Sequence, residues 1–183
     1  MKKYVIGIVG LVVALSLVAC SNNESSKEHK SMAVSSHMEH LGSAEIPKGL
    51  KVAEHPTYKV GRPVILKADH MAGMKGAKAT IKGAYHTTAY VVNYTPTTGG
   101  HPVKNHKWVI QEEIKGAGHQ TLKPGTKVIL EANHMKGMKG ASAKIVSSEK
   151  TTVYMVDYQP TTDGKPVKNH KWVTEEEITP QVK

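Results

Sequence analysis

The sequence predicts an all-β chain with two tandem, small SH3-like antiparallel β-barrels, which follow a signal peptide and a disordered tether. Three observations predict this class. The body is one unit written twice, its apolar stretches are short and β-branched, and no window keeps a 3.6-residue apolar period. In a chain of 183 residues with 39% hydrophobic residues, 5% aromatic residues and no Phe, two thin cores fit better than one large core.

The duplication defines the expected domains. A shift of 64 residues lays the second copy on the first without a gap, and 37 of the 60 positions in 55–114 are identical to those in 119–178. We therefore expect one small β-barrel in residues 46–116 and another in residues 117–183. A side chain that differs between the copies is a weaker candidate for a role that both copies share.

Each repeat contains four short segments typical of β-strands. They are 64–68, 79–81, 87–94 and 105–109 in the first repeat, and 128–132, 143–145, 151–158 and 169–173 in the second. Alternate residues of 64–68, and of 90–94, share one face and are expected in the cores. The segment Glu112-Glu113-Ile114 is expected to form a helical turn or a strand end. An OB-like barrel is compatible with the same pattern.

The N-terminus predicts export and a lipid anchor. A basic start and an apolar run fill residues 1–19, and Cys20 follows as the only cysteine. Leu17-Val18-Ala19-Cys20 resembles a bacterial lipobox, so we interpret 1–19 as a lipoprotein signal peptide and Cys20 as the lipidation site. The alternative is an uncleaved membrane anchor. We expect an extracytoplasmic protein, lipid-anchored to the cell membrane. One cysteine excludes an intramolecular disulfide and a Cys-based zinc cage.

Residues 20–45 are expected to hold the lipidated Cys and a flexible, polar tether. Several residues of this tether are potential metal ligands, and they are either incidental or capture metal loosely: His29, Met32, His37, Met38 and His40. The formal charge of +10 favours anionic surroundings. Since the chain is exported, we expect the membrane or an anionic cell-wall polymer as partner, and no nucleic acid.

The chemistry is expected in one loop that occurs twice. It runs Asp69-His70-Met71-Ala72-Gly73-Met74 in the first repeat and Asn133-His134-Met135-Lys136-Gly137-Met138 in the second. Imidazole and thioether ligands together suit a soft ion, above all Cu(I). The predicted metal ligands are His70, Met71, Met74, His134, Met135 and Met138. The alternative is that these methionines pack the cores and the histidines are buried and hydrogen-bonded. Lys75 and Lys139 disfavour a cation.

A second motif, Asn-His-Lys-Trp, also occurs twice, at 105–108 and 169–172. The tryptophans are expected at the centre of each core. If the motif folds back beside the Met loop, its histidines could complete the ligand set and its indoles could cover a cuprous ion by a cation–π contact. The residues concerned are His106, Trp108, His170 and Trp172. No nucleophile elbow, HExxH or phosphate-binding loop occurs in the sequence, so we expect no enzyme.

The duplicated HMxGMKGA loop, followed by YxVxYxPTTxGxPVKNHKWV, resembles the YdhK-like lipoproteins of Gram-positive bacteria, whose repeat is a domain of unknown function. The family includes CopL, a surface lipoprotein implicated in copper binding and copper tolerance. The resemblance implies a membrane-attached copper binder, whereas the ligand assignments come from ligand chemistry. We expect copper buffering through the His/Met loops, without an organic cofactor. The alternative is an SH3-like module that binds wall polymer or another surface partner. One shared copper site and one site per repeat both remain open.

Overall fold

The computed structural model describes residues 42–181. The predicted signal peptide, the lipidation site Cys20 and the predicted tether ligands lie outside these residues. Within 42–181, no helix has the length and apolar character needed to cross a membrane.

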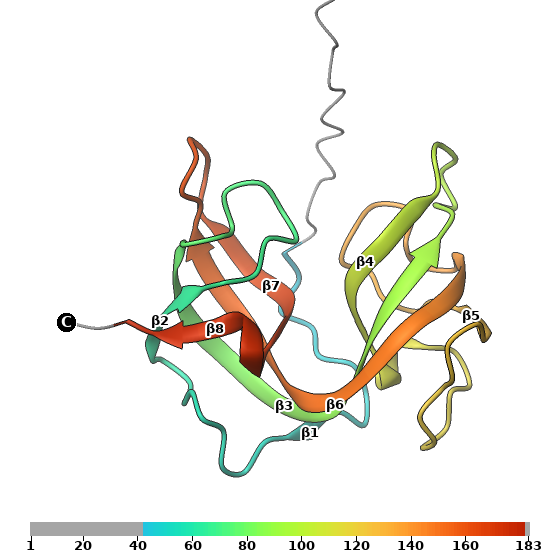
Figure 1. The fold of residues 1–183 in the computed structure, drawn as a ribbon, viewed down its shortest axis with the longest axis horizontal. Helices are drawn as coiled ribbons and strands as arrows, with labels where there is room; N and C mark the ends of the chain where they lie inside the picture. The colour runs from blue at the N-terminus through green and yellow to red at the C-terminus, as the bar shows by residue number, and fades with distance from the viewer. Residues whose placement is uncertain (1–41, 182–183) are drawn as a thin grey trace, which may run out of the picture. The chain divides into compact units, whose positions relative to one another are not determined.

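The described chain consists of strands and two short 3-10 helices (Figure 1). Their bounds are β1 Lys51–Val52, β2 Pro63–Leu66, β3 Lys78–Tyr94, β4 Val103–Ile110, η1 Gln111–Glu113, β5 Lys127–Ile129, β6 Ser142–Gln159, β7 Val167–Thr174, η2 Glu175–Glu177 and β8 Ile178–Pro180. The strand pairs are antiparallel. This confirms the predicted all-β class, and η1 confirms the helical turn expected at Glu112 and Glu113.

The sheet follows an open path, β5-β6-β3-β2-β8, and β1 and β4 pair with β3 while β7 pairs with β6. Closure of the sheet into SH3-like barrels therefore stays a prediction.

Two long strands run through the whole body. The segments expected as separate strands, 79–81 and 87–94, are parts of the 17-residue β3, and their twins are parts of the 18-residue β6. The two long strands pair from Lys78–Gln159 to Tyr94–Ala143, side by side in Figure 1. The intervening segments have no proline and no Asn-Gly or Asp-Gly turn signal, so each pair of segments is joined into one continuous strand.

As a result, each core draws on both repeats. One core, here called lobe 1, combines β2 and the start of β3 with the end of β6, β7 and β8. The other core, lobe 2, combines the end of β3 and β4 with β5 and the start of β6. This differs from the expectation of one barrel in 46–116 and one in 117–183. The reason is that β3 begins in lobe 1 and ends in lobe 2, so the strand that follows it, β4, pairs with it in lobe 2.

The alternating faces predicted for 64–68 and 90–94 do line the cores. Val64, Leu66 and Ala68 belong to lobe 1, and Tyr90 and Val92 belong to lobe 2.

The tryptophans, however, lie in neither lobe. Trp108 and Trp172 pack in a third cluster with residues from the middle of β3 and β6, such as Val91 and Val153. Alternation along β4 explains this difference, because Val109 faces lobe 2 with its partner Tyr90 and its neighbour Trp108 therefore faces the opposite side. Beyond Trp108 the pairing slips by one residue, since Val92 pairs with His106. Such bulges redirect side chains. The same slip occurs on β7.

The N-terminal end of the described chain lies against β7. Asn169 Nδ2 donates to the carbonyl oxygen of Gly42 at 3.0 Å, and Lys171 Nζ donates to that of Glu45 at 2.5 Å. Ile46 and Leu50 pack against the third cluster. Residues 42–45, expected to belong to the flexible tether, therefore have fixed contacts with the body.

Candidate functional site

Each His/Met loop is held by a turn from the other repeat. The N–H of Thr161 donates to the carbonyl oxygen of Gly73 at 2.8 Å, and that of Thr97 donates to Gly137 at 2.9 Å. The two glycines have φ of +75° and +77°, and a Cβ on either would collide with a threonine of the clamping turn. Only glycine combines this backbone conformation with this close approach.

The histidine of the first loop binds a carboxylate from the end of the second repeat. His70 Nε2 lies 2.7 Å from Glu177 Oε1, and their side chains are only 5% and 15% exposed. Glu177 Oε2 accepts the indole N–H of Trp108 at 2.8 Å and the backbone N–H of Thr174 at 3.1 Å. Lys107 Nζ is 3.6 Å from Oε1. One carboxylate thus joins the loop, η2 and β4.

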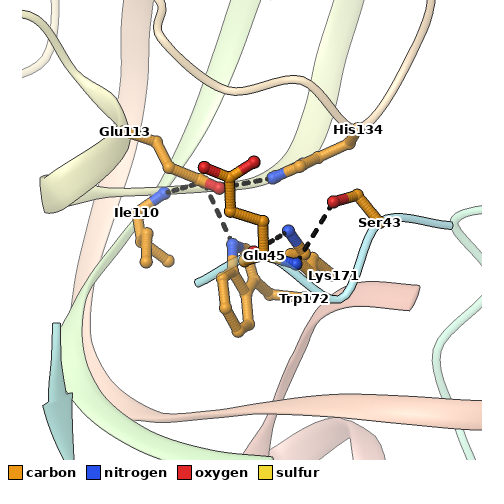
Figure 2. A network of polar contacts seen from close by, with 7 residues as sticks. All are labelled: Ser43, Glu45, Ile110, Glu113, His134, Lys171 and Trp172. Atoms are coloured by element: carbon orange, nitrogen blue, oxygen red, sulfur yellow. Dashed lines mark hydrogen bonds and ion pairs between the residues drawn. The ribbon is translucent and has the colours of Figure 1, made fainter. Parts of the chain in front are cut away.

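The second loop has the same network with the repeats exchanged (Figure 2). His134 Nε2 lies 2.6 Å from Glu113 Oε1, with side chains 3% and 5% exposed. Glu113 Oε2 accepts the indole N–H of Trp172 at 3.0 Å and the backbone N–H of Ile110 at 3.2 Å. Figure 2 also shows Lys171, which lies beside Trp172 and binds the carbonyl oxygen of Glu45.

These carboxylates determine which imidazole nitrogen is available. Burial alone would raise the pKa of Glu177, but the hydrogen bond from His70, the electrostatic interaction with that ring, and the N–H groups of Trp108 and Thr174 lower it to about 2. An ionised carboxylate can only accept hydrogen bonds, so its imidazole partner must carry the proton on Nε2. The other ring nitrogen, Nδ1 of His70 and likewise of His134, is buried and has no hydrogen-bond partner among residues 42–181.

A histidine and a thioether from different repeats surround His70. The ring centres of His70 and His170 are 6.3 Å apart. The Tyr158 ring lies 5.7 Å from that of His170, and the Tyr158 hydroxyl donates to Met71 Sδ at 3.9 Å. We name the group His70, Met71 and His170 site 1.

The equivalent group, site 2, consists of His134, Met135 and His106. Burial, and then electrostatic interaction with His134 and with His70, lower the pKa of His106 to about 3. The Nε2 of His106 is buried without a hydrogen-bond partner in the described part of the chain. Tyr94 lies 5.6 Å from His106 between ring centres, and Met135, only 4% exposed, packs in the same core as Tyr94.

The two loops therefore contribute to two sites, and each site takes its histidines from both repeats. His106 and His170, which were second-rank candidates, lie beside the loop of the opposite repeat. Met74 and Met138 are completely buried in the cores of lobe 1 and lobe 2. Of the residues in 42–181, no three His, Cys, Asp or Glu side chains form a metal-binding group. Each site thus offers two imidazoles and one thioether.

The tryptophans lie beside the loop histidines. The Trp108 ring is 6.4 Å from His70 and the Trp172 ring is 6.3 Å from His134, both edge to face. Lysine ammonium groups already lie over these indoles, Lys107 at 5.2 Å and Lys171 at 5.9 Å. In this structure the cation of the cation–π contact is therefore a lysine.

Sequence reasoning missed the two carboxylates and the two tyrosines at these sites. Glu113 and Glu177 are identical residues 64 positions apart, as are Tyr94 and Tyr158. The criterion that selected the histidines, identity between the copies, would also have selected them. The loop lysines Lys75 and Lys139, which disfavoured a cation site, are exposed.

The chain resembles proteins of one family along its length. A family model described as a protein of unknown function (DUF1541) matches residues 60–111 and 124–175. The uncharacterized protein YdhK of Bacillus subtilis (strain 168) is 60% identical over 183 residues, which cover 97% of this chain and 89% of that protein.

Two solved structures are also similar. A crystal structure of a DUF1541 family protein (ydhK) from Bacillus subtilis has 66% identity and a TM-score of 0.77, and covers 79% of this chain and 99% of that one. A solution NMR structure of the ydhK C-terminal domain from B. subtilis has 69% identity and a TM-score of 0.64, and covers 67% and 93%. The YdhK-like resemblance and the tandem repeat are thereby confirmed, and the chain belongs to the DUF1541 family of proteins of unknown function.

Proposed function

We propose that this protein binds copper as Cu(I) at site 1 and site 2 and buffers it at the cell surface, without catalysing a reaction. One observation carries the proposal: in each site, a buried histidine with an unpartnered Nδ1 lies beside a methionine and near a second histidine from the other repeat. Copper is cargo in this proposal.

The spacing of the imidazoles supports a shared ion. With metal–nitrogen bonds of about 2.0 Å, two imidazoles on one ion have ring centres at most about 6.3 Å apart, which is the value for a linear arrangement. The rings of His70 and His170 are 6.3 Å apart, close to the distance expected for a nearly linear arrangement.

The ligand set supports Cu(I) over other ions. Thioether sulfur and imidazole nitrogen suit a soft monovalent ion. A structural zinc site usually has four protein ligands, often cysteines, and calcium requires several oxygen ligands. The two histidines and one methionine of each site meet neither requirement.

The expected location supports a buffering role. The lipobox-like sequence that ends at Cys20 would hold the chain on the outer face of the cell membrane, where copper arrives first. A binder there lowers the free ion concentration at the membrane and so contributes to copper tolerance.

The test is a competitive Cu(I) titration of the full chain carrying Cys20→Ser, with the tether histidines and methionines replaced by Ala so that only the folded body can bind. We expect two equivalents. The double variant His70→Ala/His170→Ala removes both histidines of site 1 and should leave one equivalent intact. The matched variant His70→Ala/His106→Ala removes one histidine from each site and should weaken both.

The opposite pattern, one intact site in His70→Ala/His106→Ala, would show that each repeat binds copper with its own residues. Unchanged binding in all variants, or no binding by the parent, would refute the proposal. Parallel titrations with Zn(II) and Cu(II) check the preference for a soft ion.

A further inference from the structure

The two carboxylates connect the sites to each other. Glu177 holds His70 of site 1 and also the indole of Trp108, which lies two residues beyond His106 of site 2. Glu113 holds His134 of site 2 and also the indole of Trp172, which lies two residues beyond His170 of site 1. Each carboxylate therefore contacts the loop of one site and the strand that carries a ligand of the other.

We propose that Glu113 and Glu177 are positioning residues for both metal sites, each selecting the Nδ1 nitrogen of one loop histidine and orienting, through an indole, the strand histidine of the other site. The inference rests on the proposed function for its copper readout, but not for its readout on histidine tautomers.

The direct effect follows from hydrogen-bond chemistry. A histidine that binds metal through one nitrogen commonly donates its other N–H to a carboxylate, which fixes the tautomer and the ring orientation. Here the carboxylate occupies Nε2, so Nδ1 keeps its lone pair for the ion. Loss of such a partner typically weakens metal binding by about 10- to 100-fold.

Glutamine at either position should reverse the tautomer without disturbing the fold. In both networks Oε2 accepts two N–H groups, from the indole and the backbone. Oε1 faces the imidazole and, in Glu177, also lies 3.6 Å from Lys107 Nζ. A glutamine oxygen therefore stays at the Oε2 position, since an amide N–H₂ there would face two donors. Its N–H₂ group then donates to the imidazole Nε2 and moves the ring proton to Nδ1, where it blocks the metal.

The first experiment reads the tautomers in the metal-free full chain by ¹⁵N NMR of the imidazole nitrogens. In wild type, Nε2 of His70 and His134 should be protonated. Glu113→Gln should move the proton to Nδ1 in His134 only, and Glu177→Gln should do so in His70 only. Glu176→Gln, at the exposed residue beside Glu177, is the matched control and should change neither. Unchanged tautomers in the two Gln variants would overturn the inference.

The second experiment measures Cu(I) affinity with one site removed. In the His70→Ala/His170→Ala background, which retains site 2, Glu113→Gln should weaken copper about 10- to 100-fold. Glu177→Ala should weaken the same site at least about fivefold, because Trp108 loses its acceptor and the strand bearing His106 is less constrained.

The conservative variant should rescue this indirect effect. Glu177→Gln retains an oxygen for the Trp108 indole, so site 2 should bind nearly as in the background, whereas site 1 in an otherwise intact chain should be weakened. Trp108→Phe keeps the ring and removes only the N–H, and should reproduce the loss caused by Glu177→Ala at site 2. Unchanged affinity of site 2 in both Glu177→Ala and Trp108→Phe would overturn the link between the sites.

The two proposals fail in different ways. If the wild-type chain binds no Cu(I), the proposed function is refuted, while the tautomers still report whether the carboxylates select Nδ1. If copper binds but the Gln variants bind it normally, the function stands and the positioning role is refuted.

Discussion

The two methionines of each loop are expected to have different roles, one in the core and one in the proposed metal site, and substitutions can distinguish these roles. Met74 has no exposed surface and packs in the core of lobe 1, whereas Met71 is half-buried and accepts the Tyr158 hydroxyl at its sulfur. Truncation of Met74 to Ala should therefore cost about 2–5 kcal/mol of unfolding free energy. In a body of this size each kcal/mol corresponds to about 3–4 °C in Tm, so the shift should be between about 6 and 20 °C.

Leucine replaces the thioether at nearly constant volume. Met74→Leu should cost less than about 1.5 kcal/mol. It should leave Cu(I) affinity unchanged, because the Met74 side chain packs in the core of lobe 1 and is not part of the proposed site 1. Met71→Leu should also cost less than about 1.5 kcal/mol of unfolding free energy but should weaken Cu(I) binding at site 1. Denaturant unfolding of the metal-free protein and competitive Cu(I) titration measure the two quantities.

The twin pair, Met138→Leu and Met135→Leu, repeats the comparison at site 2. If Met74→Leu weakened copper as much as Met71→Leu does, the assignment of Met74 to the core alone would be refuted. If Met71→Leu bound copper normally, the thioether would have to be removed from the ligand set.

Three further predictions address the loops, the charges and the exchange of strands. Gly137 and Gly99 both have positive φ, +77° and +82°, but only at Gly137 would a new Cβ meet neighbouring atoms. Gly137→Ala should therefore lower stability clearly more than Gly99→Ala. Comparable denaturation midpoints for the two variants would contradict the contact between the loop and the clamping turn. Because Glu177 and His106 have folded-state pKa values near 2 and 3, below their usual 4.5 and 6.5, the folded state binds fewer protons than the unfolded state. The metal-free protein should accordingly lose stability as pH falls from about 6.5 to 2, first through His106 and below about 4.5 also through Glu177; a midpoint that does not fall over this range would refute the assignment. Finally, a protease site inserted after the exposed residue His119 and then cut should leave the two fragments associated in size-exclusion chromatography until denaturant is added. Separation into two folded halves would contradict the mixed cores.

Local features of the fold were predictable because they depend on short-range sequence. The alternation in 64–68 and 90–94 predicts faces that do line the cores. The turn at Glu112 and Glu113 was also expected and occurs as η1. The exchange of strands between the repeats was not predictable in this way, because two such similar copies offer nearly the same strand partners within a repeat and between repeats.

The types of ligand at the site were predictable from the sequence, but which residues come together in each site was not. Repeated histidines and methionines identified His70 and Met71, yet their spacing could not tell which histidine approaches them. That choice depends on the path of β3, which places His170, and not His106, beside His70. The Met74 side chain points into the core of lobe 1, whereas the Met71 sulfur lies at the Tyr158 hydroxyl. A short sequence motif does not specify which way each side chain of a loop points.

The mixed composition of the two cores constrains how this duplicated chain can change over time. Tyr154 and Val156, for example, fill the same core as Val64 and Leu66, although they come from the other copy. A mutation in one copy therefore alters the packing environment of the other, and compensation has to arise there. Neither copy can be lost, or acquire a separate role, without disrupting both cores. The duplication is therefore harder to reverse than a duplication that produces two independently folded domains.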